Sequence, residues 1–219
     1  MSRLYTIAAP IADIANHFGT EPAPSLEVPT EMTEGLRGLV VIERDGRRLL
    51  RSMVWGFPRK VAPGPEHREE SGIIGLVADL TNPMWERVVV DPRYRCLIVL
   101  THFANPAGEP GSKRRTWFSI EGQPIAAWAG FCRVTSEFGP AFAGMTMEAN
   151  AAIPPTNDRM PVLLDPANYG RWLHGSIEDV IAFQYGKPID AERMRVERTK
   201  HVWKSGGLPV SAKPQTALL

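Results

Sequence analysis

The sequence lacks the features that mark secreted, membrane and strongly charged proteins. It has only two cysteines among 219 residues, so it is not a disulfide-rich secreted scaffold. It has no apolar run long enough to cross a bilayer, and no basic segment followed by an apolar one at its start, so we expect neither a membrane span nor a signal peptide. The net charge is +1, which supplies no bulk attraction to nucleic acid. We therefore expect a cytoplasmic protein that would need a local basic patch to contact DNA.

Short motifs of common enzymes are also missing. The chain has no GxSxG, P-loop, GxGxxG, HExxH or CxxC motif. Its five histidines are not spaced from one another, or from the cysteines, as metal ligands are, so we expect no metal and no cofactor. His102 follows a predicted strand and is the most interesting of them, but the favoured interpretation is a partly buried side chain with one hydrogen bond.

What the sequence does contain is many short apolar runs separated by turn residues. A helical pattern covers 10–18 and ends at Gly19, and two β-rich runs flank Asp45-Gly46, which favours a tight hairpin. Residues 58–72 form a long polar loop. Both cysteines, Cys96 and Cys132, lie in apolar runs and are expected to be buried free thiols.

The second half of the chain alternates strands and helices. YRCLIVLTHF is predicted to be one buried strand, and TWFSI and IAAWAGFC are predicted to form a hairpin about EGQP. PAFAGMTM, MPVLL and RMRVERTKHVW are further strands. Helices are expected after Asp165-Pro166 and between Ser176 and Gly186. The pattern predicts a single α+β domain over residues 1–203 and a loosely held tail over 204–219.

Basic and aromatic residues are candidates for nucleic-acid contact. Trp55 ends a strand and could stack on a base, although a core position is the more common one for such a tryptophan. Three groups of cations could meet phosphates, although solvated charge is again the more common case: Arg44/Arg47/Arg48/Arg51, Arg59/Lys60 and Lys113/Arg114/Arg115.

An ordered series of motifs resembles one family. MSRLY is similar to an MCxxY-type start, MVWGFP to WGxxP, VADLTNPMW to N-x-R-N-x-x-S-P-x-W, and RCLIVLTHFAN to RCLxPxxxFxE. AAWAGF, TMEANAAIPPTNDRMPVLL and NYGRWLHG resemble later motifs, in the same order, including IHxRMPVIL. The family is the SOS response-associated peptidase (SRAP) family.

The resemblance implies a fold and a chemistry. The fold would be one domain with a curved, barrel-like, mostly antiparallel β-sheet and flanking helices. The activity would be recognition of abasic sites in single-stranded DNA, where an N-terminal cysteine traps the sugar aldehyde as a thiazolidine. A glutamate and a histidine transfer protons, an asparagine orients the site, and arginines hold phosphates.

This chain departs from the family at the chemical positions. Ser2 matches the cysteine, Asn105 the glutamate and Asn157 the histidine. The orienting asparagine falls at Leu76 and a phosphate arginine at Ala78, unless a shifted register pairs that asparagine with Asn82. The DNA-binding positions that the resemblance retains are Arg3, Trp55, Gly56 and Arg159.

These changes predict lost or altered catalysis. A hydroxyl is a much weaker nucleophile than a thiolate, and an asparagine amide cannot act as a general acid or base. We therefore expect an abasic-site-sensing, single-stranded DNA-binding pseudoenzyme. One alternative is a repurposed interaction or regulatory protein that uses the same groove. Another is a residual peptidase or lyase that uses the Ser2 amine, which a retained Met1 would block. A remnant without a selected function is the remaining alternative.

Overall fold

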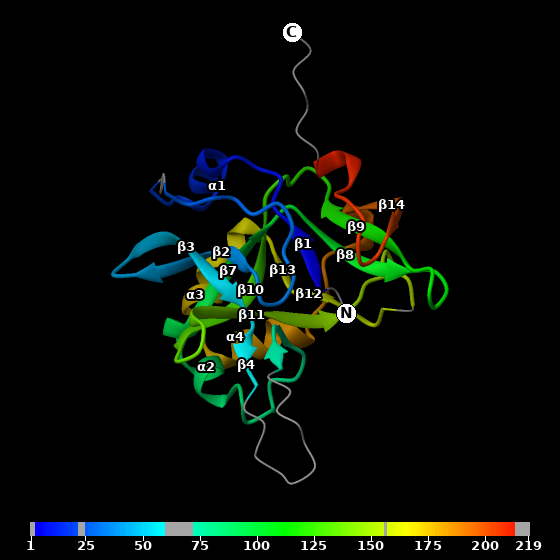
Figure 1. The fold of residues 1–219 in the computed structure, drawn as a ribbon. Helices are drawn as coiled ribbons and strands as arrows, with labels where there is room; N and C mark the ends of the chain where they lie inside the picture. Colours follow the sequence, from blue (N-terminus) through cyan, green and yellow to red (C-terminus); the bar gives the residue numbers. More distant parts are fainter. Residues whose placement is uncertain (1–2, 22–24, 60–71, 156, 213–219) are drawn as a thin grey trace.

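Two sheets organise the chain, and helices line their edges (Figure 1). In the computed structural model, the described residues are 3–21, 25–59, 72–155 and 157–212. The helices are α1 (Ile11–Phe18), α2 (Glu86–Val90), α3 (Tyr169–His174) and α4 (Ile177–Tyr185). Short 3₁₀ turns cover Pro92–Tyr94, Pro166–Asn168, Ala191–Arg193 and Val210–Ala212.

The strands are mostly short. Their bounds are β1 (Leu4–Thr6), β2 (Arg37–Arg44), β3 (Arg47–Trp55), β4 (Phe57–Pro58), β5 (Ile73–Ile74), β6 (Leu76–Val77), β7 (Arg95–Leu100), β8 (His102–Ala107), β9 (Arg114–Ile120), β10 (Ala126–Thr135), β11 (Gly139–Glu148), β12 (Arg159–Pro161), β13 (Leu163–Leu164) and β14 (Met194–Val202).

The larger sheet is partly ringed but is not a true barrel. Its strand order is β12-β11-β3-β2-β7-β10-β13, with β6 also paired to β11, and β11 pairs with β10 as well as with β3. The pairings of β11 with β3 and β6 are parallel, whereas its pairing with β10 is antiparallel, like the other pairings of this sheet. The curved, mostly antiparallel sheet expected from the family resemblance is therefore present.

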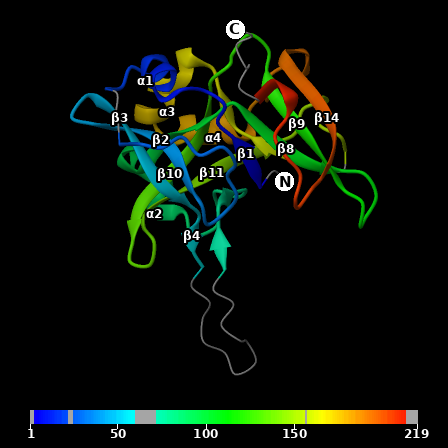
Figure 2. The ribbon, with the colours of Figure 1, turned by 45° about the horizontal axis from the view of Figure 1, so that its top comes forward.

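The smaller sheet has the order β1-β8-β9-β14 and is antiparallel throughout. Figure 2 shows it at the opposite side of the molecule from the β2–β3 hairpin. Tyr5, Phe103 and Phe118 from three neighbouring strands join the main core, whereas Leu4, Ala104 and Trp117 form a separate cluster on the other face. Alternation along the strands thus gives this sheet two differently covered faces.

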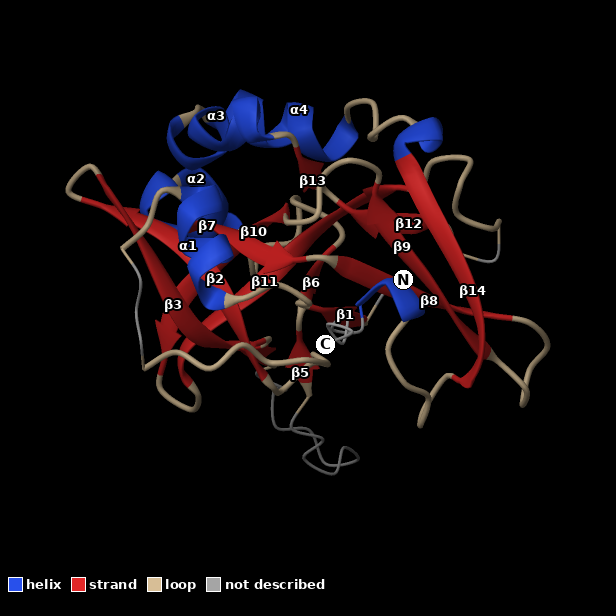
Figure 3. Cartoon of the chain, turned by 90° about the horizontal axis from the view of Figure 1, so that it is seen from above, coloured by secondary structure: helices blue, strands red, loops and turns tan. Residues whose placement is uncertain are grey.

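The helices cover the larger sheet. α2 contacts β10, α3 contacts β7 and α4 contacts β11, and Figure 3 shows α3 and α4 along one edge of the molecule. The Trp172 indole of α3 donates to the carbonyl of Cys96 at 2.9 Å. The Arg95 guanidinium reaches the carbonyls of Trp172 and Gly175 at 3.1 and 2.6 Å. Retained family residues of the WL-containing helix and the RCL strand therefore hold one another in place.

Several local predictions are confirmed. The first helix ends at Gly19, whose φ of 64° is left-handed. Asp45 and Gly46 have φ of 51° and 72°, which is the two-residue turn expected between β2 and β3. Cys96 and Cys132 are buried and free. The helix α4 begins after Ser176, whose backbone N–H donates to Asp179 at 2.9 Å.

Two strand predictions are wrong. YRCLIVLTHF is not one strand, because the chain bends at Thr101 and passes from the larger sheet to the smaller one. The Thr101 N–H and hydroxyl both donate to the carbonyl of Thr6, at 2.9 and 3.1 Å. TWFSI and IAAWAGFC are both strands but do not form a hairpin, since β9 and β10 belong to different sheets. Apolar runs predict burial, but they do not identify the partner strand.

The described part of the tail is held more firmly than the sequence predicts. Trp203 and Leu208 pack on the Leu4 cluster, and Ala212 is buried. The backbone N–H of Val210 and the Ser211 hydroxyl donate to Glu197 of β14. Residues 213–219 of the predicted tail lie outside the described residues, as do 60–71 of the predicted long loop.

Candidate functional site

Strand β8 carries the first of the predicted site residues. Asn105 is 1% exposed and pairs with Thr116 of β9. Its Oδ1 and Nδ2 have no hydrogen-bond partner among the described residues. A buried amide without partners costs about 1–3 kcal/mol, so such positions usually have a reason other than stability.

Asn157 reaches the same strand from a distant part of the sequence. It is 5% exposed, and its Nδ2 donates to the carbonyl of Pro106 at 3.3 Å. Pro106 directly follows Asn105, so the fold brings together the two positions that match the family's glutamate and histidine. Ser2 lies outside the described residues. The described chain begins at Arg3, and the next residue, Leu4, pairs with Ala104 of β8.

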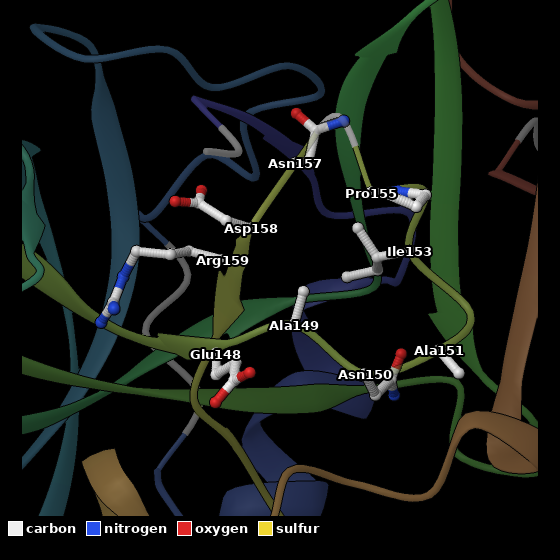
Figure 4. A pocket seen from close by; sticks show the side chains of 9 residues that line it. All are labelled: Glu148, Ala149, Asn150, Ala151, Ile153, Pro155, Asn157, Asp158 and Arg159. Carbon is white, nitrogen blue, oxygen red and sulfur yellow. The ribbon is translucent and has the colours of Figure 1, made fainter.

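Arg159 lines the same pocket as Asn157 but extends away from it (Figure 4). Its Nε donates to the Thr146 hydroxyl at 2.9 Å, and its Nη2 donates to the carbonyls of Ala78 and Thr146, the former at 3.0 Å. These contacts join β12 to β11 and to the residue after β6. The guanidinium therefore helps to hold these three strands together.

The pocket beside Asn157 has a volume of about 520 Å³. Two carboxylates, Glu148 and Asp158, accompany Arg159 among its lining residues. Both acids are exposed. An anion in this pocket would therefore meet one cation that already has three acceptors, and two negative charges. The lining is not an electrostatic trap for phosphate.

Arg3 and the VADLTNPMW segment contain further residues that the resemblance assigns to the site. The Arg3 side chain is 60% exposed and donates to Glu34 at 3.0 Å, and Glu34 also accepts from the Gly75 N–H. Ala78 accepts a hydrogen bond from Arg159, whereas Asn82 lines a different pocket, between α2 and α4. Ala78 thus lies next to Arg159, whereas Asn82 lies in another part of the fold.

Trp55 and Gly56 differ from the expectation for a stacking platform. Trp55 is 0% exposed, and its indole donates to the carbonyl of Gly75 at 2.8 Å. Its ring packs against Tyr5 and Trp128, with centroids 5.0 and 5.7 Å apart. A fully covered ring offers no face to a base, so Trp55 is a core residue in this structure. Gly56 is buried beside it. Its φ of 118° forms the bend that follows β3.

The cations of the three basic clusters differ in their exposure and in their hydrogen-bond partners. Arg115 is 2% exposed and makes a two-point ion pair with Glu31, at 2.6 and 3.1 Å, so it is not a free phosphate ligand. In the hairpin, Arg44 and Arg48 donate to the carbonyls of Arg93 and Phe18. Arg114 stays exposed. Lys60 lies outside the described residues.

His102 has a structural role, but it is more buried than the sequence predicts and has two hydrogen-bond partners rather than one. It is 8% exposed, with Nδ1 2.9 Å from the Thr101 hydroxyl and Nε2 3.1 Å from the Ser211 hydroxyl. Burial lowers the pKa of its imidazole to about 4. Among the described residues, no group of three or more histidine, cysteine, aspartate or glutamate side chains is arranged to hold a metal.

A family model identifies the architecture. The model described as SOS response associated peptidase (SRAP) matches residues 1–202. The chain belongs to the SRAP family. Family membership associates it in general terms with the response to DNA damage. No curated protein matches the chain.

Solved structures agree on the fold at low sequence identity. A protein from Bacteroides thetaiotaomicron is similar with a TM-score of 0.73 at 17% identity, over 90% of this chain and 91% of that one. A protein from Bordetella bronchiseptica gives 0.70 at 19% identity, over 91% and 99% of the two chains. A phage-related protein from the same organism gives 0.67 at 15% identity, over 91% and 94%. In the part of the SRAP chain that the structure describes, no helix is long and apolar enough to cross a membrane.

Proposed function

We propose that this SRAP protein binds single-stranded DNA, including DNA with abasic sites, without forming the family's covalent crosslink. The observation that carries the proposal is the placement of Asn105 and Asn157 against the same stretch of β8, beside a β1 strand that begins just after Ser2. The scaffold of the site is kept, but amides stand where proton transfer is needed. An amide has no titration near neutral pH and cannot replace a carboxylate or an imidazole.

The loss at Ser2 supports the same proposal. Thiazolidine formation needs a sulfur nucleophile, and the oxazolidine from a serine would reopen readily in water. A Schiff base from a free Ser2 amine would remain available if Met1 is removed. Three coordinated changes in one site favour an altered function over a chance substitution, because groups that act as a unit lose activity together.

The test combines binding and crosslinking. Fluorescence anisotropy with a single-stranded oligonucleotide, intact or abasic, over a salt series should show salt-dependent binding, because phosphate contacts release counterions. A denaturing gel after incubation with abasic DNA should show no crosslinked band for the wild type. The triple variant Ser2→Cys, Asn105→Glu, Asn157→His should gain one. Absence of salt-dependent binding by the wild type, or a heat-stable crosslink from it, would contradict the proposal.

A second candidate is a repurposed interaction protein that uses the same groove for a peptide or a small molecule. The carboxylates of Glu148 and Asp158 in the pocket, and the bonded state of Arg159, favour it. A third candidate, residual chemistry at Ser2, requires a free amine there, and intact mass spectrometry that finds Met1 retained would eliminate it. We also propose a cytoplasmic location, since the two thiols are free and a reducing compartment keeps them so.

A further inference from the structure

Strands β9 and β14 bring together cations that lie far apart in the sequence. Arg114 pairs with Val202, and the Trp203 N–H donates to the carbonyl of Lys113 at 2.9 Å. The Arg114 guanidinium donates to the carbonyl of Lys200 at 2.6 Å. The residues called here the β9–β14 strip are the exposed cations where the start of β9 meets the end of β14: Lys113, Arg114, Arg198, Lys200 and Lys204.

The strip has little negative charge to balance it. Among the described residues, none of its five members forms an ion pair. Two acids on neighbouring segments are already engaged, Glu31 by Arg115 and Glu197 by the Val210 N–H and Ser211. Glu109, in the loop before β9, remains. The chain as a whole has a net charge of only +1, so this local excess of cations is a marked departure from the average surface.

A bulge in β14 increases the density of cations. Between the pairs Arg198–Thr116 and Val202–Arg114, four residue steps along β14 oppose two along β9. The extra residues include Lys200, whose carbonyl accepts from Arg114. Bulges of this kind redirect side chains at sheet edges. β14 is the last strand of the smaller sheet, and no further strand of the described residues covers its outer edge.

Arg114 and Arg198 of the strip are on the same face of the smaller sheet as Asn105. Residues directly opposite each other in an antiparallel sheet share a face. Asn105 pairs with Thr116, and Thr116 pairs with Arg198, so one row leads across the sheet from the candidate site to the strip. The next row on that face contains Ala107 and Arg114.

We infer that the β9–β14 strip binds the phosphate backbone of single-stranded nucleic acid and leads the strand to the Asn105 face. The inference rests on the proposed function and adds where the electrostatic contacts lie. Exposed arginine and lysine side chains without carboxylate partners suit phosphate oxygens, which accept several hydrogen bonds at once. The acidic lining of the Asn157 pocket makes a separate source of phosphate contacts necessary.

The hairpin cluster is the alternative basic surface and supplies a matched control. It lies across the molecule from β9 and β14 (Figures 1 and 2). Arg47 and Arg51 are exposed there, and Arg51 donates to the carbonyl of Leu50 at 2.9 Å. A double variant in either place removes the same charge, so nonspecific attraction would weaken both equally.

The experiment compares Arg198→Gln/Lys200→Gln with Arg47→Gln/Arg51→Gln in the full chain, by anisotropy with a single-stranded oligonucleotide. We expect about tenfold weaker binding for the strip variant. The slope of log affinity against log salt should fall by about 1.4, because each lost contact to a single strand contributes about 0.7. The hairpin variant should bind almost as the wild type does. Circular dichroism and melting temperature check that both variants fold.

The outcomes separate this inference from the proposed function. Wild-type binding with an unchanged slope in the strip variant would overturn the inference and leave the proposed function standing. Equal losses in both variants would also overturn it, because the attraction would then be nonspecific. If the wild type shows no salt-dependent binding, the proposed function fails, and this inference with it.

Discussion

The side-chain amide of Asn157 donates to the backbone carbonyl of Pro106 at 3.3 Å, across 51 residues of sequence. The contact places the segment before β12 on β8, one residue from Asn105. Two residues that sequence reasoning assigned to one site are therefore neighbours in the fold. Both are amides, which do not titrate near neutral pH.

Asn105→Leu should raise the free energy of unfolding by about 1–2 kcal/mol, because it replaces a buried amide that has no described partner with an apolar group of similar size. The same variant should bind DNA more weakly if the amide serves a ligand. Residues kept for function commonly show this trade between stability and activity. Urea denaturation and anisotropy measure the two effects.

Asn150→Leu is the matched control for that variant. Its Nδ2 donates to the carbonyl of Ile189 at 2.7 Å, and its Oδ1 accepts from the Ala152 N–H at 3.1 Å. Losing these bonds should destabilise the fold by about 1–3 kcal/mol. If Asn105→Leu is destabilising to the same degree, the buried amide has a structural partner and the functional interpretation is wrong.

Gly144→Ala should destabilise the protein by about 3 kcal/mol or more, because an added Cβ would lie 1.9 Å from the ring of Trp128. That ring is fixed, since its indole donates to the carbonyl of Met145 at 2.6 Å. Gly170→Ala in α3 is the control: nothing lies within 4 Å of its Cβ, and alanine favours a helix by up to about 1 kcal/mol. Thermal denaturation should rank the two variants on opposite sides of the wild type.

Local signals in the sequence were sufficient for some parts of the fold. The Asp45-Gly46 turn and the Gly19 helix end depend on conformations that few residues adopt, so the residues themselves identify them. The strand boundary at Thr101 has no such signal. It depends on hydrogen bonds from the N–H and hydroxyl of Thr101 to the carbonyl of Thr6, 95 residues away, which no local pattern reveals.

In the candidate site, too, some features could be predicted from the sequence and others depend on contacts between distant residues. Ordered motifs placed Asn105 and Asn157 together because a family's scaffold keeps its motif order. The burial of Trp55 could not be read from its position before a glycine, because the rings that cover it come from Tyr5 and Trp128. Lys113 and Arg114 are adjacent in the sequence, but Arg198 and Lys200 are brought close to them only by the β9–β14 pairing.

His102 should reduce the stability of the fold in mild acid. Burial lowers its pKa to about 4 in the folded protein, against about 6.5 when unfolded. Above pH 6.5 both states are neutral, and between pH 6.5 and 4 only the unfolded state takes up the proton. The free energy of unfolding should therefore fall by about 3 kcal/mol over that window, with no further change from His102 below pH 4.

The control for this effect is His102→Gln, measured by urea denaturation at several pH values. The difference between wild type and variant should shrink as the pH falls from 6.5 to 4. Exposed carboxylates contribute to both proteins alike and cancel in that difference. A ring proton resonance of His102 that titrates near pH 6.5 in the folded protein would contradict the prediction.

The Arg115–Glu31 pair should be one of the more costly ion pairs to break. The Arg115 side chain is 3% exposed, and it also donates to the carbonyl of Trp203 at 3.0 Å. Glu31→Gln leaves a guanidinium buried without its counter-charge, and we expect a loss of about 2–3 kcal/mol, below the value for fully buried pairs because Glu31 is 37% exposed.

The matched control is Asp91→Asn, which removes the carboxylate from the pair with Arg93, whose side chain is 82% exposed. That variant should cost much less stability than Glu31→Gln, because surface ion pairs contribute little. Hydrogen exchange gives a second readout, since Arg115 links β9 to the segment after β14. Exchange at residues 203–208 should be faster in Glu31→Gln and unchanged in Asp91→Asn. That result would show that the buried pair holds this segment against the smaller sheet. Equal stability losses in the two variants would contradict the prediction.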